Sequence, residues 1–138
     1  MNSITITSFF DSQGQLLKNL ISDQGKENIK EIIDFLQFQN KDKLNRNEKL
    51  NINQLRKFYD SFLKIYNTKV DETEKKIQLL MLKANAEYSA KRLHTNRFKD
   101  FLSNRINIVV SKNGEDFKKN LNAFKLHFEA LVAYYPKN

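Results

Sequence analysis

The chain has 138 residues, of which 40% are hydrophobic and 29% are charged, and this composition suits one soluble globular domain with its own core. It contains no cysteine and only two histidines, which excludes disulfide frameworks, thiolate zinc sites and cysteine nucleophiles and makes a multi-histidine metal centre untenable. Three glycines and one proline are too few for a phosphate-binding glycine loop or for the tight turns of a β-sandwich.

The net charge of +8 is distributed unevenly along the chain. Seven Lys and Arg balance seven Asp and Glu in residues 1–55, so the whole excess lies in residues 56–138. Residues 75–112 alone carry nine basic side chains against Glu87 and Asp100. Such a distribution favours a polyanion as a partner, although a basic surface can also serve only to keep a protein in solution.

The first third of the chain shows weaker patterns than the rest. Residues 4–10 alternate isoleucine with polar residues and end on two phenylalanines, which predicts a short strand or an extended arm that docks its aromatic side chains. Apolar residues at 16–21 predict one or two helical turns, and those in 26–39 predict a helix. Residues 40–50 are polar and predict a connecting loop. Because clean patterns begin later, we expect the protein to keep its fold without residues 1–25.

Four amphipathic helices are predicted for the remainder. The first covers about 51–67 and opens on a capping box formed by Asn51 and Gln54. The second runs from an acidic start at residues 71–74 to about Leu93 and is the longest. Its predicted apolar face carries Ile77, Leu80, Met81, Ala84 and Tyr88.

The last two helices are separated by a break at Asn113-Gly114. The final helix has apolar residues spaced four, three, four, three and four apart, which suits shallow packing against a neighbouring helix. These residues are Phe117, Leu121, Phe124, Phe128, Leu131 and Tyr135. Together the patterns predict an all-α, single-domain bundle of about five helices. We assign residues 1–50 to an N-terminal arm and helix with a polar connecting loop, and residues 51–138 to the helical core.

No set of residues in the sequence completes a catalytic site. Carboxylate pairs such as Asp71 with Glu74 lie where helix starts favour acidic side chains. His94 and His127 have neither a paired nucleophile nor a set of metal ligands, so we interpret them as surface or packing residues. We therefore predict that the protein is not an enzyme and has no cofactor and no metal site.

Signals for export or for membrane insertion are absent from the sequence. The N-terminus lacks a basic region followed by a long apolar stretch, and no apolar run approaches the ~20 residues that a membrane span needs. We therefore expect a cytoplasmic protein with no membrane contact.

Basic side chains recur at a spacing of seven residues on three helices. They project the same way, off the apolar stripes, and are expected to be exposed: Lys57 with Lys64, Lys76 with Lys83, and Lys118 with Lys125. Such side chains contact the phosphate backbone of a nucleic acid without reading its sequence. Arg56 and Arg92 lie at the edges of apolar faces, where a guanidinium either bonds within the fold or clamps a phosphate.

Aromatic side chains beside these cations could stack bases, as single-strand binding surfaces do. Core packing is the better interpretation for nearly all the aromatic residues, because most lie on the helix stripes. The candidates that remain are Tyr59, Tyr66, Tyr88 and Tyr134.

Three motifs, taken in order, resemble a known family. LRKFY at residues 55–59 opens one helix, YSAKR at 88–92 lies near the end of the longest helix, and FEALVAY at 128–134 closes the chain. Over about residues 50–136 the chain resembles the small subunit of the type III-A CRISPR (Csm) interference complex. It departs from the family's pattern at Lys91, where similar proteins often have a small residue.

The resemblance implies a non-catalytic RNA-binding subunit of an RNA-guided effector complex. Small subunits of this family stack head to tail beside the backbone subunits, and the two together line the groove that holds the guide–target RNA duplex. The partners implied are CRISPR RNA, target RNA, the backbone and large subunits, and further copies of the chain in tandem. The expected RNA-binding residues are Arg56, Lys57, Lys64, Lys83, Lys91 and Arg92.

Two other interpretations remain open at this stage. A protein-binding helical adaptor would carry its basic surface only for solubility and would show no salt-sensitive retention of RNA. A DNA-binding bundle would prefer duplex DNA and would need a recognition helix, which we do not find in the sequence.

Overall fold

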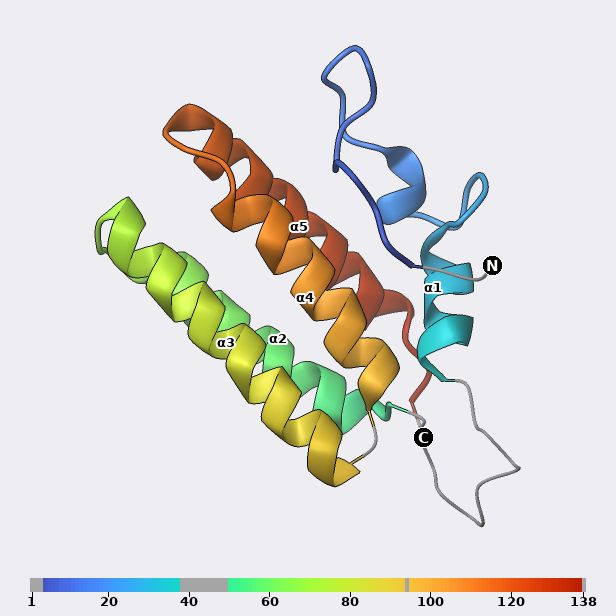
Figure 1. The fold of residues 1–138 in the computed structure, drawn as a ribbon. Helices are drawn as coiled ribbons and strands as arrows, with labels where there is room; N and C mark the ends of the chain where they lie inside the picture. The colour runs from blue at the N-terminus through green and yellow to red at the C-terminus, as the bar shows by residue number, and fades with distance from the viewer. Residues whose placement is uncertain (1–3, 38–49, 94, 138) are drawn as a thin grey trace.

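The computed structural model describes residues 4–37, 50–93 and 95–137. Within these ranges it contains one 3-10 turn and five α-helices, which confirms the predicted all-α bundle. They are η1 (Lys18–Leu20), α1 (Ile29–Leu36), α2 (Ile52–Asn67), α3 (Glu72–Leu93), α4 (Asn96–Val110) and α5 (Glu115–Tyr134). The four long helices run side by side, and α1 and the N-terminal arm lie on the side away from α3 (Figure 1). His94 and nearly all of the predicted loop at 40–50 lie outside the described residues.

Local sequence signals set the ends of these helices. The Asn51 side chain accepts a hydrogen bond from the Gln54 amide, and the Gln54 side chain accepts one from the Asn51 amide, each at 2.9 Å, which confirms the predicted capping box. Asp71 Oδ1 accepts from the Glu74 amide at 2.8 Å at the start of α3. Gly114 adopts a φ of 61° between α4 and α5, where a side chain would strain the backbone.

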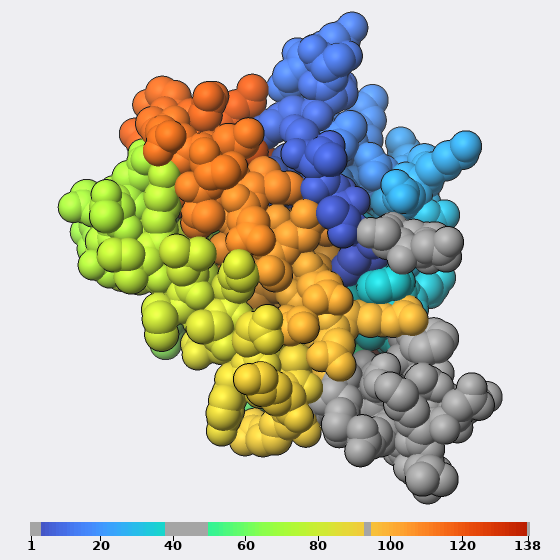
Figure 2. Space-filling model, viewed as in Figure 1, coloured from blue at the N-terminus to red at the C-terminus, as the bar shows by residue number. Residues whose placement is uncertain are grey.

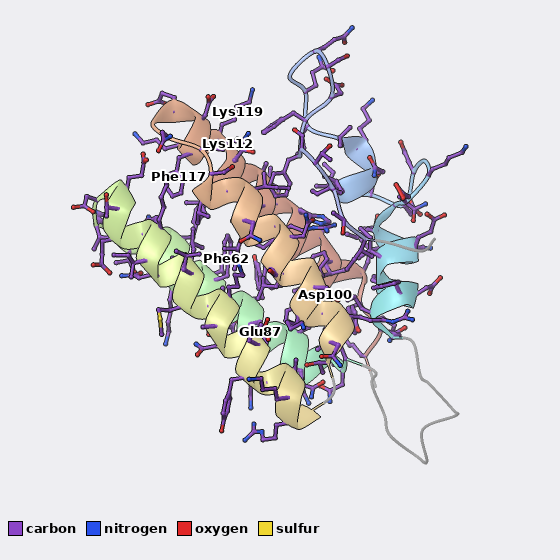
Figure 3. All side chains as sticks on the ribbon, in the orientation of Figure 1. Phe62, Glu87, Asp100, Lys112, Phe117 and Lys119 are labelled. Carbon is purple, nitrogen blue, oxygen red and sulfur yellow. The ribbon has the colours of Figure 1, made fainter. Side chains whose placement is uncertain are left out.

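The apolar seam of α5 forms the centre of the core. Its six residues from Phe117 to Tyr135 are each at most 5% exposed, as their spacing predicts. Phe124 and Phe128 pack against Phe62 of α2, with ring centroids 4.9 and 5.7 Å apart. Phe62 lies in the interior between the helices (Figure 3). Aromatic contacts at these distances add to the apolar surface that the bundle buries.

The N-terminal arm belongs to the same core. Phe9 is fully buried and stacks on Phe124 with centroids 6.0 Å apart, and Ile4 and Leu20 are buried in the same cluster. Of the two predicted conformations, the extended arm with a docked aromatic side chain is therefore the one observed. These side chains fill the space beside α5, so the packing argues against the expectation that the protein keeps its fold without residues 1–25.

Two buried polar side chains fasten this arm from inside the bundle. Arg105 of α4 donates to the Ile4 carbonyl and, through Nε, to His127 Nε2 of α5 at 3.3 Å. His127 Nδ1 in turn donates to the Leu20 carbonyl at 2.5 Å. His127 is therefore neutral with its hydrogen on Nδ1, because Nε2 must accept from the guanidinium. The interpretation of His127 as a packing residue is correct, and it also anchors the arm.

We expect acid to destabilise the fold through His127. Burial, together with the charge of Arg105, lowers the pKa of His127 from 6.5 to about 3. Between these two values the unfolded chain binds a proton that the folded chain excludes. The contribution of His127 to the free energy of unfolding is therefore complete above about pH 6.5. It falls by about 1.4 kcal/mol per pH unit as the pH drops toward 3. Denaturant titrations at several pH values in this window measure the slope.

The matched control for this prediction is His127→Gln. Glutamine offers one donor and one acceptor but does not titrate, so the variant loses stability overall while its pH dependence between about pH 4 and 6 becomes shallower. Equal slopes in the two proteins would assign the acid sensitivity to other groups.

Candidate nucleic-acid interface

Two of the predicted RNA-binding residues meet at one end of the bundle. Residues 68–71 turn the chain between α2 and α3, so the two helices are antiparallel and the start of α2 lies beside the end of α3. There Lys57 and Arg92 line a pocket of about 120 Å³. Both side chains are exposed, and neither forms an ion pair with any residue that the structure describes. Their charges are therefore available to a ligand.

The rest of the pocket supplies hydrogen-bonding groups and a fixed wall. Its other lining residues are Leu50, Gln54, Phe58, Ser89 and Thr95. The Tyr135 hydroxyl donates to the Leu50 carbonyl at 2.5 Å, which ties the segment before α2 to the end of α5. Two cations with amide and hydroxyl donors on one concave surface form the kind of site that binds phosphate oxygens.

Arg56 and Lys91 extend the positive surface beyond the pocket. Each is the chain neighbour of one pocket cation, each is exposed, and neither is in an ion pair within the described ranges. Four of the six predicted residues therefore lie where the start of α2 is next to the end of α3. The sequence motifs found these cations separately, but only the helical hairpin shows that they are neighbours.

An exposed aromatic ring lies beside these cations. The guanidinium carbon of Arg92 is 5.8 Å from the ring centroid of Tyr88. Tyr59 and Tyr66 are instead held within the bundle, by hydrogen bonds from their hydroxyl groups to α5. Burial and the neighbouring carboxylate of Glu129 raise the pKa of Tyr59 to about 12. Tyr88 is therefore an exposed ring next to a basic side chain, the arrangement in which a base can stack.

Lys83 and Lys64 do not join this group. Lys83 is half-buried, and its Nζ donates to Asn107 of α4 at 2.9 Å. Lys76, in the same predicted row, pairs with Glu72 at 3.1 Å. The predicted exposure of that row is therefore wrong. Lys64 lies farther along α2 and lines a separate groove of about 360 Å³ between α2 and α3.

The reason for this difference is the rotation of α3 about its axis. The residues it buries are Leu79, Leu82, Ala86 and Ala90. The residues predicted to face inward are Ile77, Leu80, Met81, Ala84 and Tyr88, and all five are exposed. Both sets repeat at helical spacing, so periodicity alone does not choose between them.

Comparison with known proteins bears on this arrangement. The family model described as Csm2 Type III-A matches residues 26–137. The chain belongs to this family. It is therefore a subunit of a type III-A CRISPR complex. Comparisons with curated proteins and with solved structures give no match. The matched range begins at residue 26 and includes α1, whereas the three motifs lie between residues 55 and 134.

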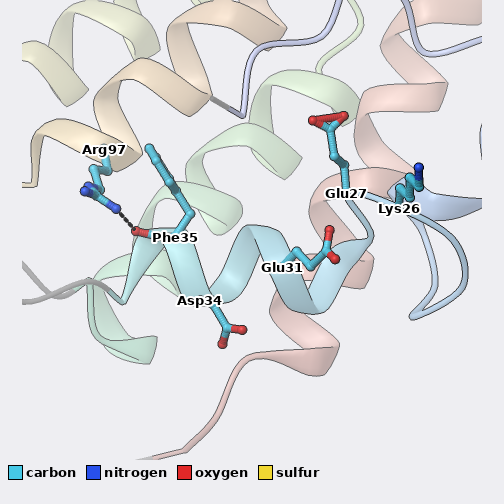
Figure 4. Close-up of a pocket in the computed structure, with 6 residues that line it drawn as sticks. All are labelled: Lys26, Glu27, Glu31, Asp34, Phe35 and Arg97. Atoms are coloured by element: carbon cyan, nitrogen blue, oxygen red, sulfur yellow. Dashed lines mark hydrogen bonds between the residues drawn. The ribbon is translucent and has the colours of Figure 1, made fainter. Parts of the chain in front are cut away.

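This Csm2-family subunit has a second, larger pocket beside α1. Its lining includes acidic side chains, which the Lys57–Arg92 pocket lacks. It measures about 500 Å³ and is lined by Lys26, Glu27, Glu31, Asp34, Phe35 and Arg97 (Figure 4). Arg97 donates to the Phe35 carbonyl at 3.2 Å and so binds the end of α1. The carboxylates of Glu27 and Asp34 point in opposite directions. Nowhere in the described ranges do three or more His, Asp or Glu gather closely enough to hold a metal ion.

Among the described residues, no helix combines the length and the apolar character that crossing a bilayer requires.

Proposed function

We propose that the chain is a non-catalytic, RNA-contacting subunit of the type III-A CRISPR complex. The observation that carries the proposal is the pocket between the start of α2 and the end of α3. There Lys57 and Arg92 are exposed, and neither is in an ion pair with a residue that the structure describes. In this proposal the two side chains bind phosphates of the CRISPR RNA–target RNA duplex, and Arg56 and Lys91 contact neighbouring phosphates.

The chemistry of these groups supports contact with a backbone rather than with base edges. Guanidinium and ammonium groups donate to phosphate oxygens whatever the base sequence, so they position a protein on RNA without specifying a site. In RNA-guided complexes base pairing with the guide supplies the specificity. A subunit that contributes only phosphate contacts is sufficient in that setting.

The partners in this proposal are the CRISPR RNA and the target RNA, the backbone and large subunits, and copies of the chain arranged in tandem. We propose that this assembly works in the cytoplasm, where its RNA partners are present. The non-catalytic role agrees with the place of His127, which is buried and occupied in holding the N-terminal arm.

The test is the salt dependence of RNA binding by the free protein. If a handful of phosphates are contacted, affinity for single-stranded RNA falls by orders of magnitude between ~50 and ~200 mM salt. Fluorescence anisotropy with two labelled RNAs of unrelated sequence measures the slope, and the two RNAs should bind alike. Binding that ignores salt, or that strongly prefers one sequence, would contradict phosphate recognition.

Lys83→Gln serves as an internal comparison in the same assay. Because Lys83 already donates to Asn107, its charge is held against α4 rather than offered to solvent. We expect the variant to bind RNA almost as tightly as the unchanged protein. A large loss would show that Lys83 reaches RNA despite this contact.

A protein-binding adaptor without nucleic-acid contact is the second candidate function. The observation that favours it is the exposed apolar side of α3, which suits a protein rather than a polyanion. Such an adaptor would show no salt-sensitive RNA binding in the assay above.

A further inference from the structure

The turn between α4 and α5 contains the pair Asn113-Gly114, which occurs only once in the sequence. In such a pair the backbone nitrogen of the glycine can attack the side-chain carbonyl carbon of the asparagine, because glycine has no side chain to hinder the approach. Both residues are exposed, so water reaches them. The pair therefore has the sequence and the exposure of a site that deamidates without an enzyme.

Two side chains of α3 hold both groups that would react. Glu72 Oε1 accepts a hydrogen bond from the Gly114 amide at 2.9 Å, and Lys76 Nζ donates one to Asn113 Oδ1 at 2.9 Å. Glu72 and Lys76 also form an ion pair, with Nζ and Oε2 3.1 Å apart. The four residues are thus one connected network. Figure 2 shows the start of α3, in yellow-green, against the α4–α5 turn, in orange, at one end of the molecule.

The network is charged and has a fixed support. Lys76 Nζ lies 5.2 Å from the ring centroid of Phe117, which is buried in the core. Hydrogen bonds from the Lys76 side chain and from the Gly114 amide hold the pKa of Glu72 below its ordinary value of 4.5, so Glu72 is ionised at neutral pH. Hydrogen bonds to an ionised group are shorter and stronger than those between neutral groups.

Deamidation requires the bond to Glu72 to break. The Gly114 nitrogen gives its proton to solvent and forms a bond to Asn113 Cγ, and the bond from Cγ to Nδ2 breaks as that nitrogen takes up a proton and leaves as ammonia. Water then opens the five-membered succinimide ring to aspartate or to isoaspartate. The ring has no N–H at residue 114, and on the way to it the attacking nitrogen becomes negative beside a carboxylate, which is unfavourable.

We propose that Asn113 is a deamidation site that the folded chain suppresses, chiefly through Glu72. Lys76 adds a second bond, which restrains the Asn113 side chain in its present conformation. A chain that unfolds loses both contacts while keeping the reactive pair. The modification therefore accumulates in copies that have been unfolded and is slow in copies that have not.

The isoaspartate product would disturb the start of α5. The Asn113 carbonyl accepts from the Phe117 amide at 3.4 Å, and the Gly114 carbonyl accepts from the Lys118 amide at 3.2 Å. Isoaspartate carries one more carbon in the backbone between these two carbonyls and the end of α4. We therefore expect a chain with isoaspartate at residue 113 to melt at a lower temperature than the unmodified chain.

The rate of deamidation in the folded and the unfolded chain tests the proposal. The purified protein is kept at neutral pH with and without denaturant, and samples are digested with pepsin at acid pH, where the reaction stops. Mass spectrometry of the peptide that contains residues 113 and 114 gives the fraction converted. We expect the folded chain to convert more slowly by about tenfold or more, the factor that one charge-assisted hydrogen bond supplies.

Substitution of Glu72 separates its contact from the fold as a whole. Glu72→Ala should raise the rate in the folded chain by about tenfold, and Glu72→Gln, which keeps an acceptor oxygen but no charge, should raise it less. The matched control is Glu74→Ala, which removes the same charge from the same turn of α3. Because Glu74 accepts from Gln78 and not from the α4–α5 turn, this variant should react at the wild-type rate. Melting temperatures show that each variant is folded.

The outcomes divide clearly. A folded Glu72→Ala chain that converts no faster than wild type would overturn the proposal, and so would a slower one, because the carboxylate would then act as a base that promotes the attack. Equal acceleration by Glu74→Ala would assign the effect to net charge. If Glu72→Ala does not fold, Glu72→Gln decides in its place. A folded wild-type chain that converts as fast as the denatured chain would show that the fold suppresses nothing.

Discussion

A chain that lacks residues 1–21 is expected to show no cooperative thermal transition. The deletion removes Ile4, Phe9 and Leu20 from the core, and burying large apolar side chains of this kind contributes roughly 2–5 kcal/mol each. It also removes the carbonyl acceptors of Arg105 and His127, and an uncompensated buried charge costs about 3–5 kcal/mol. Together these losses match or exceed the whole stability of a typical domain, about 5–15 kcal/mol. Circular dichroism during heating measures the transition.

Adjacent phenylalanines provide the matched pair for this prediction. Phe9 is fully buried against Phe124, whereas Phe10 is half-buried with Lys119 over its ring at 4.5 Å. Phe9→Ala should therefore cost about 3–5 kcal/mol, and Phe10→Ala clearly less. If the shortened chain melts cooperatively at the wild-type temperature, or if the two substitutions cost the same, the arm does not stabilise the bundle as the structure indicates.

Reversing the charge of Lys57 and Arg92 together should weaken target-RNA binding by the assembled complex by about 10²- to 10⁴-fold. The estimate takes two charge-assisted hydrogen bonds at about 1.5–3 kcal/mol each, and copies of the subunit along one RNA would multiply the loss. The variant is Lys57→Glu with Arg92→Glu, and titration of labelled target RNA measures it. Because both side chains are exposed, the free subunit should keep its melting temperature within a few degrees.

The matched control changes the same net charge on α5, none of whose residues lines the pocket. Lys118→Glu with Lys125→Glu alters two α5 lysines that already pair with Glu115 and Glu129. We expect this control to bind target RNA almost normally. An equal loss in both double variants would mean that affinity follows net charge and not the pocket. Replacing Arg92 alone by Ala or by Lys gives a finer comparison, since a lysine cannot reproduce the planar fork of a guanidinium.

The sequence predicts best those features that depend on neighbouring residues. The capping box of α2 and the start of α3 are made within three residues of chain. The α5 seam is the stripe that carries the phenylalanine side chains of its helix. Such signals need no knowledge of the rest of the fold. They are therefore correct in position as well as in type.

The features missed by the sequence analysis depend on contacts between distant segments. The orientation of α3 is not predictable from periodicity, because the helix carries two apolar stripes and only its neighbours decide which is buried. The pocket between Lys57 and Arg92 exists because α2 and α3 fold back on each other. The arm is held by hydrogen bonds from Arg105 of α4 and His127 of α5 to its backbone carbonyls. The residues next to Arg105 and His127 in the sequence do not indicate these contacts.

The attachment of the arm also determines when the protein can finish folding during its synthesis. The Ile4 carbonyl accepts a hydrogen bond from Arg105, which lies 101 residues later in the chain. The Leu20 carbonyl accepts one from His127, which lies 107 residues later. At about 5–20 residues per second, a ribosome takes roughly 5–20 s to make the intervening chain. For that time Phe9 lacks Phe124, on which it stacks in the folded protein. The arm is thus made well before the residues that hold it in its native place.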